Sequence, residues 1–268
     1  MSGPSKPAFT YDPSKPSIAR VYDHWLGGKD NFAADRNFAD ELAGVLPNVH
    51  QIVRANRLFL GNAVRHLVAD HGVAQFLDIG AGLPTADNVH QVAQACDPQA
   101  RVVYVDNDPE VTAHGRALLA DDDRTGVVEA DLRDPDAVLA DPVTAALLDR
   151  DRPVAVMMVS ILHFVGDADD PHRMVARYLE AVPPGSFLVV SAARAEPLVG
   201  AEIENLYRTR LGDRGGDGAI ARTEAEILRF FDGLELLPPG LVSVTRWRPG
   251  QAADGPDVPF VAAVARKP

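Results

Sequence analysis

Apolar residues follow a helical period in the first quarter of the chain and form short continuous runs in the rest. Between Ile18 and His71 they recur every three or four residues, as on the buried face of a helix, and Gly72 supplies a C-terminal stop. From residue 76 onward, short apolar runs alternate with segments of helical period. Strands that are apolar throughout are typical of a parallel sheet covered by helices on both faces. The pattern therefore predicts a helical N-terminal segment followed by an α/β domain.

Strands and helices alternate regularly over the first part of this domain. The predicted strands share a continuous apolar character and cover residues 76–79, 101–106, 126–130, 154–159 and 187–190. A predicted helix follows the first strand and its glycine turn and extends to about residue 95. Two more predicted helices follow the second and fourth strands, over residues 109–120 and 172–181. Such an alternation predicts a parallel sheet.

The alternation breaks over residues 194–222, which we interpret as an insertion or lid. This stretch combines a predicted helix over 196–211 with a Gly- and Asp-rich loop over 212–218. The closing elements are a helix and two strands, over 224–232, 241–247 and 259–265. Because a closing strand pair is typical of an antiparallel sheet edge, we expect a seven-stranded, mostly parallel Rossmann-like sheet with an antiparallel edge strand. Residues 1–17 are expected to form a flexible tail, 18–72 an N-terminal helical cap, and 73–268 the α/β domain.

Composition narrows the partners and the compartment. The formal charge of −12 and the pI near 5.0 disfavour binding to nucleic acid phosphates. The chain has neither a signal peptide pattern nor an apolar run long enough to cross a membrane, so we expect a cytoplasmic protein without membrane contact. Cys96 is the single cysteine, which excludes an intrachain disulfide and a cysteine-based zinc site. We expect Cys96 to be a small core residue and no metal to be bound.

Three of the predicted strands end in residues that suit an adenosine pocket. Gly80, Ala81 and Gly82 follow the first strand, and glycine lets the backbone turn tightly and approach a ligand closely. Asp106 ends the second strand, where a carboxylate can accept both hydroxyls of a ribose. Asp131 ends the third strand, where an acid can accept from the adenine amine. Each carboxylate, taken singly, could also be only a helix cap, but ligands of open parallel sheets bind beyond these strand ends.

A dinucleotide site is the alternative, and the glycine turn argues against it. Residues 80–85 lack the third small residue of the dinucleotide fingerprint, and Pro84 is expected to start a helix rather than to present an amide to pyrophosphate. Asp78, two residues before the first glycine, has no standard function in such a site. A nicotinamide-dependent oxidoreductase is therefore disfavoured relative to a protein that binds a ligand without phosphates.

These motifs resemble those of a known family. Residues 76–82, 103–109 and 129–135 look like motifs I, II and III of class I S-adenosylmethionine-dependent methyltransferases, and residues 183–187 resemble the turn before their fifth strand. Residues 19–32 are similar to the opening of an actinobacterial family called S-adenosyl methyltransferase, which residues 54–57 and 83–85 also fit. The resemblance covers nearly the whole chain from Ile18. It implies the class I fold and S-adenosyl-L-methionine as cofactor, and it leaves the acceptor open.

The resemblance also implies how the cofactor is held. At its methionine end, Gly80, Ala81 and Gly82 would shape the turn, with Asp78 close to the sulfonium. At its adenosine end, the implied binding residues are Asp106 for the ribose diol, Asn107 for the adenine edge, and Asp131 with the Leu132 amide for the adenine ring. The spacing from Gly80 to Asp106 is longer than is usual in the family and fits a longer first helix.

The acceptor side is predicted less sharply. His163 follows the fourth strand and could deprotonate a hydroxyl, or it could only cap the strand. Ser160 is expected to line the methionine end of the pocket.

The N-terminal cap carries an unusual density of polar and aromatic residues, and the candidates are Tyr22, Trp25, Lys29, Asn31, Arg54 and Arg57. We expect the cap to cover the pocket mouth, with Arg54 or Lys29 near the cofactor carboxylate or an acidic substrate. Alternatively, Tyr22 and Trp25 only pack the cap onto the sheet. A methyltransferase acting on a small molecule is the expected function; a non-catalytic sensor or partner protein that binds the same cofactor is the alternative.

Overall fold

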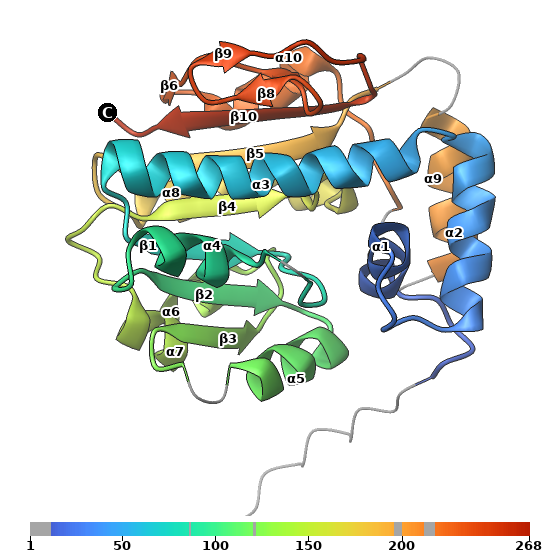
Figure 1. The fold of residues 1–268 in the computed structure, drawn as a ribbon, viewed down its shortest axis with the longest axis horizontal. Helices are drawn as coiled ribbons and strands as arrows, with labels where there is room; N and C mark the ends of the chain where they lie inside the picture. Colours follow the sequence, from blue (N-terminus) through green and yellow to red (C-terminus); the bar gives the residue numbers. More distant parts are fainter. Residues whose placement is uncertain (1–11, 86, 120–121, 196–199, 212–217) are drawn as a thin grey trace, which may run out of the picture.

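The structure is a computed structural model that describes residues 12–85, 87–119, 122–195, 200–211 and 218–268. Its centre is one sheet with helices on both faces and a helical cap at one end (Figure 1). The parallel strands are β1 (Gln75–Ile79), β2 (Arg101–Asp106), β3 (Thr125–Glu129), β4 (Ala155–Val159) and β5 (Phe187–Ala193). They lie in the order β3-β2-β1-β4-β5, so the strand order reverses between β1 and β4. Ligands of such sheets bind at this reversal, beyond the carboxyl ends of the strands.

The expected antiparallel strand lies next to β5, on the side of the sheet formed by the last part of the chain. β10 (Phe260–Arg266) runs antiparallel to β5 along its whole length. Two short strands, β6 (Glu235–Leu236) and β7 (Val242–Ser243), pair with β10 in turn. The sheet therefore has eight strands among the described residues instead of seven, and β10 lies one place inside the edge. The mostly parallel class I architecture is confirmed.

The strand predicted over residues 241–247 is interrupted. After β7 the chain turns, with the Arg246 amide donating to the Ser243 carbonyl, and Trp247 leaves the sheet. Trp247 begins a separate ladder of β8 (Trp247–Arg248) with β9 (Gln251–Ala252). Its indole is fully buried and meets the Phe59 ring edge to face at 4.9 Å. Burial of this large ring under the helix Val49–His71 takes precedence over continued pairing with β10.

Each face of the sheet packs on its own group of helices. On one face, α3 (Val49–His71) and α4 (Val89–Cys96) bury apolar side chains against the strands. The other face is covered by α6 (Pro135–Ala140), α7 (Pro142–Leu147), α8 (Pro171–Glu180) and α10 (Glu224–Leu228). The remaining helix of this part, α5 (Pro109–Leu118), follows β2.

The cap stands at the carboxyl ends of the parallel strands (Figure 1). It consists of α1 (Ile18–Leu26), α2 (Ala33–Val45) and the first turns of α3. A further helix, α9 (Gly200–Leu211), comes from the predicted insertion and packs against α2. Apolar residues of these helices form one cluster separate from the two faces of the sheet. The predicted insertion is therefore part of the cap; most of its Gly- and Asp-rich loop, 212–217, lies outside the described residues.

Three local expectations need correction. The helix after the glycine turn begins at Val89 and not at Pro84, because Asn88 and Gln91 form its capping box. The extra length between Gly80 and Asp106 therefore lies in a loop, not in a longer helix. Cys96, expected in the core, is exposed.

The N-terminal tail is in part ordered by contacts. Residues 1–11 lie outside the described part of the chain, but the Ser17 amide donates to Asp35 at 2.9 Å, and Lys15 accepts from Arg20. Within the described residues, none of the helices combines the length and apolarity needed to span a membrane.

Candidate functional site

A cleft of about 550 Å³ opens at the carboxyl ends of the parallel strands, beneath the cap. Its lining joins the ends of the first four strands to residues of α1 and α3. This volume lies in the range of small-molecule sites, roughly 300 to 1,000 Å³. The sequence-predicted residues that line it are Tyr22, Arg57, Asp78, Gly80, Ala81, Gly82, Asp106, Asn107, Asp131, Leu132 and Ser160.

The glycine turn after β1 is shaped by two different constraints. Gly80 has a φ of 76°, and a Cβ at this position would lie 2.5 Å from Cγ1 of Ile161. Gly82 also has a positive φ, 66°, but a Cβ there would meet nothing within 4 Å. The amides of Gly80 and Ala81 both donate to the Val105 carbonyl, which ties the turn to β2. Gly80 therefore allows the backbone to pass Ile161, while Gly82 leaves open space on the cleft side.

Asp106 fixes the relation between the glycine turn and the end of β2. Its Oδ2 accepts from the Gly82 amide at 2.9 Å, and its Oδ1 accepts from the Asp108 amide at 2.9 Å. Burial raises the pKa of Asp106, and these backbone donors oppose that shift. Each oxygen retains acceptor capacity, so the carboxylate is held ready for hydroxyl donors in the cleft.

Asp78 is a buried carboxyl group on the floor of the cleft. Its side chain is 6% exposed, and burial raises its pKa to about 7. The positive charge of Arg57 opposes this shift, and the negative charge of Asp106 adds to it. Such a group gains most from a nearby cation, which would stabilise the charged carboxylate.

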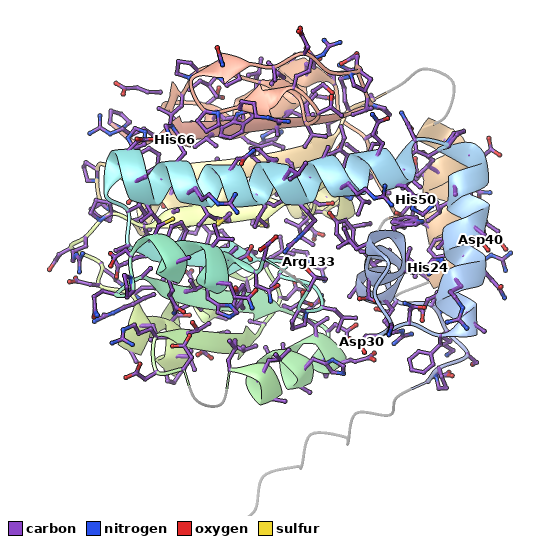
Figure 2. The ribbon with its side chains drawn as sticks, in the orientation of Figure 1. His24, Asp30, Asp40, His50, His66 and Arg133 are labelled. Atoms are coloured by element: carbon purple, nitrogen blue, oxygen red, sulfur yellow. The ribbon has the colours of Figure 1, made fainter. Side chains whose placement is uncertain are left out.

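Asp131 reaches the cleft as half of an ion pair. Arg133 grips its carboxylate with Nε and Nη2, at 3.0 and 2.6 Å, and this contact lowers the pKa of Asp131. Figure 2 labels Arg133 near the strand ends on the side that faces the cap. No described residue accepts a hydrogen bond from the neighbouring Leu132 amide. This edge of the cleft therefore presents both an acceptor and a free backbone donor.

The charge of the cleft favours a cationic ligand. Its acidic lining residues are Asp12, Asp23, Asp78, Asp106, Asp108, Glu110 and Asp131. Its basic lining residues are Arg20, Arg57 and Arg133, and all three bond to carboxylate or carbonyl oxygens. A pyrophosphate would meet several carboxylates here, whereas a sulfonium or ammonium group would be attracted.

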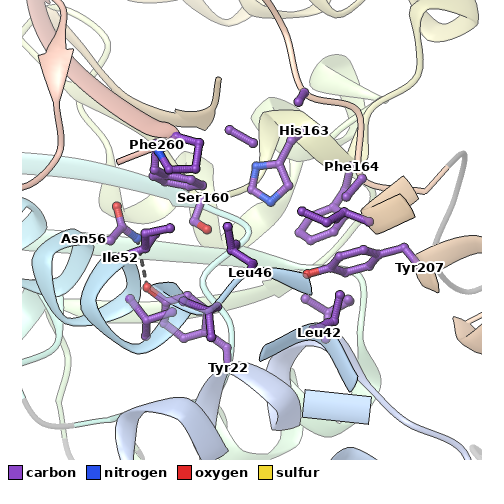
Figure 3. Close-up of a pocket in the computed structure, with 18 of the residues that line it drawn as sticks. Tyr22, Leu42, Leu46, Ile52, Asn56, Ser160, His163, Phe164, Tyr207 and Phe260 are labelled. Carbon is purple, nitrogen blue, oxygen red and sulfur yellow. Dashed lines mark hydrogen bonds between the residues drawn. The ribbon is translucent and has the colours of Figure 1, made fainter. Parts of the chain in front are cut away.

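A second cavity of about 120 Å³ adjoins the cleft inside the cap (Figure 3). The two share lining residues at their junction, namely Ile18, Tyr22, Asn56, Ser160 and Phe164. Away from the junction, the second cavity is bounded by apolar and aromatic side chains of α1, α2, α3 and α9, with Phe260 on β10. Ser160, which follows β4, has a positive φ of 61° that turns the chain at this junction.

His163 lines the second cavity from the 3₁₀ turn Leu162–Phe164. The ring points into the cavity in Figure 3, and the Phe164 ring lies beside it, tilted by 51°, with 4.2 Å between centroids. Burial, and then the charge of Arg222, lower the pKa of His163 to about 3. The near-neutral value expected for an ordinary histidine is therefore not retained, because the ring is out of water and close to a guanidinium.

A sequence profile of the S-adenosyl methyltransferase family matches residues 5–268. The chain belongs to this family. S-adenosyl-L-methionine is accordingly its cofactor, and the fold described above is that of class I methyltransferases. No curated protein matches the sequence.

Two solved structures resemble this S-adenosyl methyltransferase over most of their length. A candidate methyltransferase from Thermobifida fusca YX is 42% identical, with a TM-score of 0.88 over 95% of this chain and 96% of its own. A DUF574 family protein from Streptomyces avermitilis MA-4680 is also 42% identical, with a TM-score of 0.88 over 96% and 99%. The mitomycin 7-O-methyltransferase shares the fold at 18% identity, with a TM-score of 0.50 over 96% of this chain and 74% of its own.

The cleft fits the family's cofactor. The open space at Gly82, the unpaired Leu132 amide and the buried Asp78 carboxyl each provide what one part of S-adenosylmethionine requires. Asp78 and the glycine turn would hold the cationic methionine end, and Asp106 the ribose. Asn107, Asp131 and the Leu132 amide would hold the adenine.

Some predicted cap residues lie away from both cavities. Lys29 and Arg54 are exposed and line neither the cleft nor the second cavity. Asn31 donates to Asp23 at 2.9 Å and to the Gly28 carbonyl, so it supports the turn after α1. Trp25 lines the second cavity, while Tyr22 lines both.

Sequence reasoning missed several residues of the site. Tyr207 on α9 and Phe164 line the second cavity, and Arg133 holds Asp131. Arg222, 5% exposed, donates to the carbonyls of Leu162 and Val165 and so fixes the turn that carries His163. Of these residues, only Arg133 could have been found from the local sequence, because it lies two residues after Asp131. Tyr207 and Arg222 reach the site from the distant 194–222 stretch, and Phe164 reaches it through the geometry of the 3₁₀ turn.

We expect Gly80→Ala to destabilise the protein by about 2 to 4 kcal/mol, since the left-handed backbone costs about 1 to 2 and the clash with Ile161 adds an overpacking term. Gly82→Ala is the matched control and should cost only the backbone term, about 1 to 2 kcal/mol. Urea unfolding measures both. Equal losses in the two variants would contradict the close approach at Ile161.

Proposed function

We propose that this S-adenosyl methyltransferase transfers a methyl group to a small-molecule acceptor bound in the second cavity, inside the cap. The observation that carries the proposal is the junction of the two cavities, where Tyr22, Asn56 and Ser160 line both. An acceptor in the second cavity would meet the methionine end of the cleft there. The cap lies over this junction and would hold the acceptor in line with the methyl group, which is the main requirement of such a transfer.

When bound, S-adenosylmethionine supplies an electrophilic methyl group on a positively charged sulfur. The acceptor's heteroatom contributes the electron pair of the new bond, the pair of the broken C–S bond stays on sulfur, and the heteroatom's proton leaves to water. The chain's contribution is chiefly positioning. The Asp78 carboxylate balances positive charge in the cleft, and the rings of the cavity orient the acceptor.

The lowered pKa of His163 bears on whether this residue removes a proton from the acceptor. With a pKa of about 3, the ring is neutral at pH 7 and a weak base, so it is poorly suited to remove a proton from an alcohol before transfer. We therefore assign His163 a position in the acceptor wall rather than proton abstraction. The rate of methyl transfer should therefore show no increase between pH 6 and 7 that comes from deprotonation of His163.

The donor half is tested with Asp106→Asn. Loss of the carboxylate's charge-assisted hydrogen bonds to ribose should weaken S-adenosylmethionine binding by tenfold or more, about 1.5 to 3 kcal/mol, in isothermal titration calorimetry. Asp40→Asn is the matched control, because Asp40 is exposed on the outer side of α2 (Figure 2). Equal affinity in both variants would contradict the assignment of Asp106.

The acceptor half is tested by formation of S-adenosylhomocysteine from S-adenosylmethionine in the presence of fractionated small molecules. Product formed above the background without acceptor supports the proposal. Tight cofactor binding with no turnover on any fraction would instead favour a non-catalytic sensor or partner protein.

A further inference from the structure

The second cavity is walled by a continuous series of aromatic rings (Figure 3). The His163 ring lies 5.7 Å from Phe260 and 4.2 Å from Phe164, measured between centroids. Phe164 in turn lies 5.5 Å from Tyr207. Rings at such distances favour a further ring in an edge-to-face or offset position. The wall therefore suits an aromatic guest better than a branched aliphatic one.

The size of the cavity limits the guest to one ring. Its volume is about 120 Å³. An apolar cavity of roughly 150 Å³ engineered in another protein holds benzene. Two fused rings would need the cap to open or the cavity lining to shift, since packed interiors tolerate little added volume.

The cavity offers no partner to a charged guest. Among the described residues that line it, Arg194 carries the only formal charge, and Arg194 pairs with Glu224 at 3.0 Å and Asp257 at 2.7 Å. His163 is neutral at pH 7, and burial raises the pKa of Tyr207. A carboxylate or ammonium brought here would lose its hydration and would gain no ion pair in the cavity. Neutral guests are favoured.

The direction of the hydrogen bond at the Tyr22 hydroxyl, at the junction, is set by a chain of neighbouring hydrogen bonds. The Ser160 amide can only donate, and it donates to Oγ of Ser191; Ser191 Oγ donates to Asn56 Oδ1 at 2.6 Å. Asn56 Nδ2 then donates to the Tyr22 hydroxyl at 2.9 Å. The Tyr22 oxygen is thus an acceptor in this chain, and its proton has no acceptor among the described residues. Tyr22 therefore presents a hydrogen-bond donor where the cavity meets the cleft.

We propose that the methyl acceptor is a neutral molecule built on a single aromatic ring, whose polar atom accepts a hydrogen bond from Tyr22 while the ring fills the second cavity. This inference rests on the proposed function and specifies its substrate class. The ring would be held by Trp25, Phe164, Tyr207 and Phe260. Its polar atom would lie beside Ser160, at the methionine end of the cleft.

The test is a ligand-observed NMR titration of the protein loaded with S-adenosylhomocysteine. Phenol and aniline, neutral single rings, should bind; benzoate and benzylammonium, of similar size but charged, should bind at least tenfold more weakly. The two-ring 1-naphthol should also bind more weakly than phenol. Equal or tighter binding of a charged or two-ring probe, or no binding of any neutral ring, would overturn the inference.

Two variants test the position of the guest. Tyr22→Phe should weaken phenol about three- to tenfold and leave toluene unchanged, because only phenol can accept the lost hydrogen bond. Equal weakening of both ligands would mean that Tyr22 only packs. Ala221→Phe should block ring binding while S-adenosylhomocysteine affinity stays unchanged; Ala221 lines only the second cavity. Ala137→Phe, at an exposed position, is the control, and a similar loss there would count against the site.

Isothermal titration calorimetry with S-adenosylhomocysteine distinguishes a wrong acceptor class from a wrong proposed function. If this ligand binds but no neutral ring does, the acceptor class is wrong and the proposed methyl transfer stands. If S-adenosylhomocysteine itself does not bind, the proposed function and the acceptor class both fail.

Discussion

Replacing Arg20 by alanine is expected to lower the free energy of unfolding by about 3 to 5 kcal/mol. Arg20 is 4% exposed, and its Nε donates to Oδ2 of the fully buried Asp35 at 2.8 Å. The same guanidinium pairs with Glu110 on α5 and donates to the Lys15 carbonyl at 2.6 Å. Its loss would leave the Asp35 charge inside the protein without its cationic partner, which is the costly way to break a buried ion pair. Urea unfolding at pH 7 measures the effect.

The matched control is Arg36→Ala, one residue from Asp35 in sequence. Arg36 is exposed and bonds only to Asn31 among the described residues, so its loss should cost at most about 0.5 kcal/mol. The double variant with Asp35→Ala should lose clearly less than the sum of the two single variants, because the second change removes the orphaned charge. Strict additivity would show that Arg20 and Asp35 do not stabilise the cap as a pair.

Asp78→Asn is expected to stabilise the protein without cofactor while weakening cofactor binding. The folded pKa of Asp78, about 7, lies above its ordinary value of 3.8. A raised carboxyl pKa contributes stability that is present below pH 3.8 and lost as the pH rises through 7. At pH 8 the carboxylate therefore costs at most about 4 kcal/mol, from roughly three pKa units at 1.36 kcal/mol each. Asparagine, being neutral, removes most of that cost.

The measurement is urea unfolding of wild type and Asp78→Asn at pH 5 and pH 8. The stabilising effect of the substitution should be larger at pH 8 by about 2 kcal/mol or more, since the wild-type carboxyl is mostly protonated at pH 5. Wild-type affinity for S-adenosylmethionine should rise from pH 6 to 8, as the carboxylate forms. The Asn variant should bind more weakly with a flat profile. A wild-type stability that does not fall between pH 5 and 8 relative to the variant would contradict the raised pKa.

Such a pairing of lower stability with better binding is typical of functional sites. The protein holds the Asp78 carboxyl group where burial disfavours its charge, and we expect a cationic ligand to supply the missing partner. Asp106 differs because backbone amides of Gly82 and Asp108 already support its carboxylate. The two acids of the cleft are thus prepared for different partners, one for a cation and one for hydroxyl donors.

Local sequence determined the cofactor side of this protein. Asp78, the glycine turn, Asp106 and Asp131 each lie at a strand end, and parallel strands bring all their carboxyl ends to one edge. The position along a strand is therefore enough to predict that these residues meet. The start of the helix that follows the glycine turn is less well determined by the local sequence. The spacing of residues between Gly82 and Asn88 also allows a helix, and the N-cap at Asn88 is what fixes the start of α4.

The second cavity, where we propose that the acceptor binds, was decided by tertiary structure. Tyr207 and Arg222 come from the 194–222 stretch, and they reach the site because α9 packs on α2 and because the Arg222 guanidinium binds the carbonyls of the His163 turn. Neither contact has a signal in local periodicity. Likewise, an isolated histidine predicts a near-neutral pKa, and only burial beside Arg222 lowers that of His163 to about 3. The sequence by itself thus determined the fold class and the methyl donor, through residues whose positions follow from strand order; the second cavity depends on packing between segments far apart in the chain.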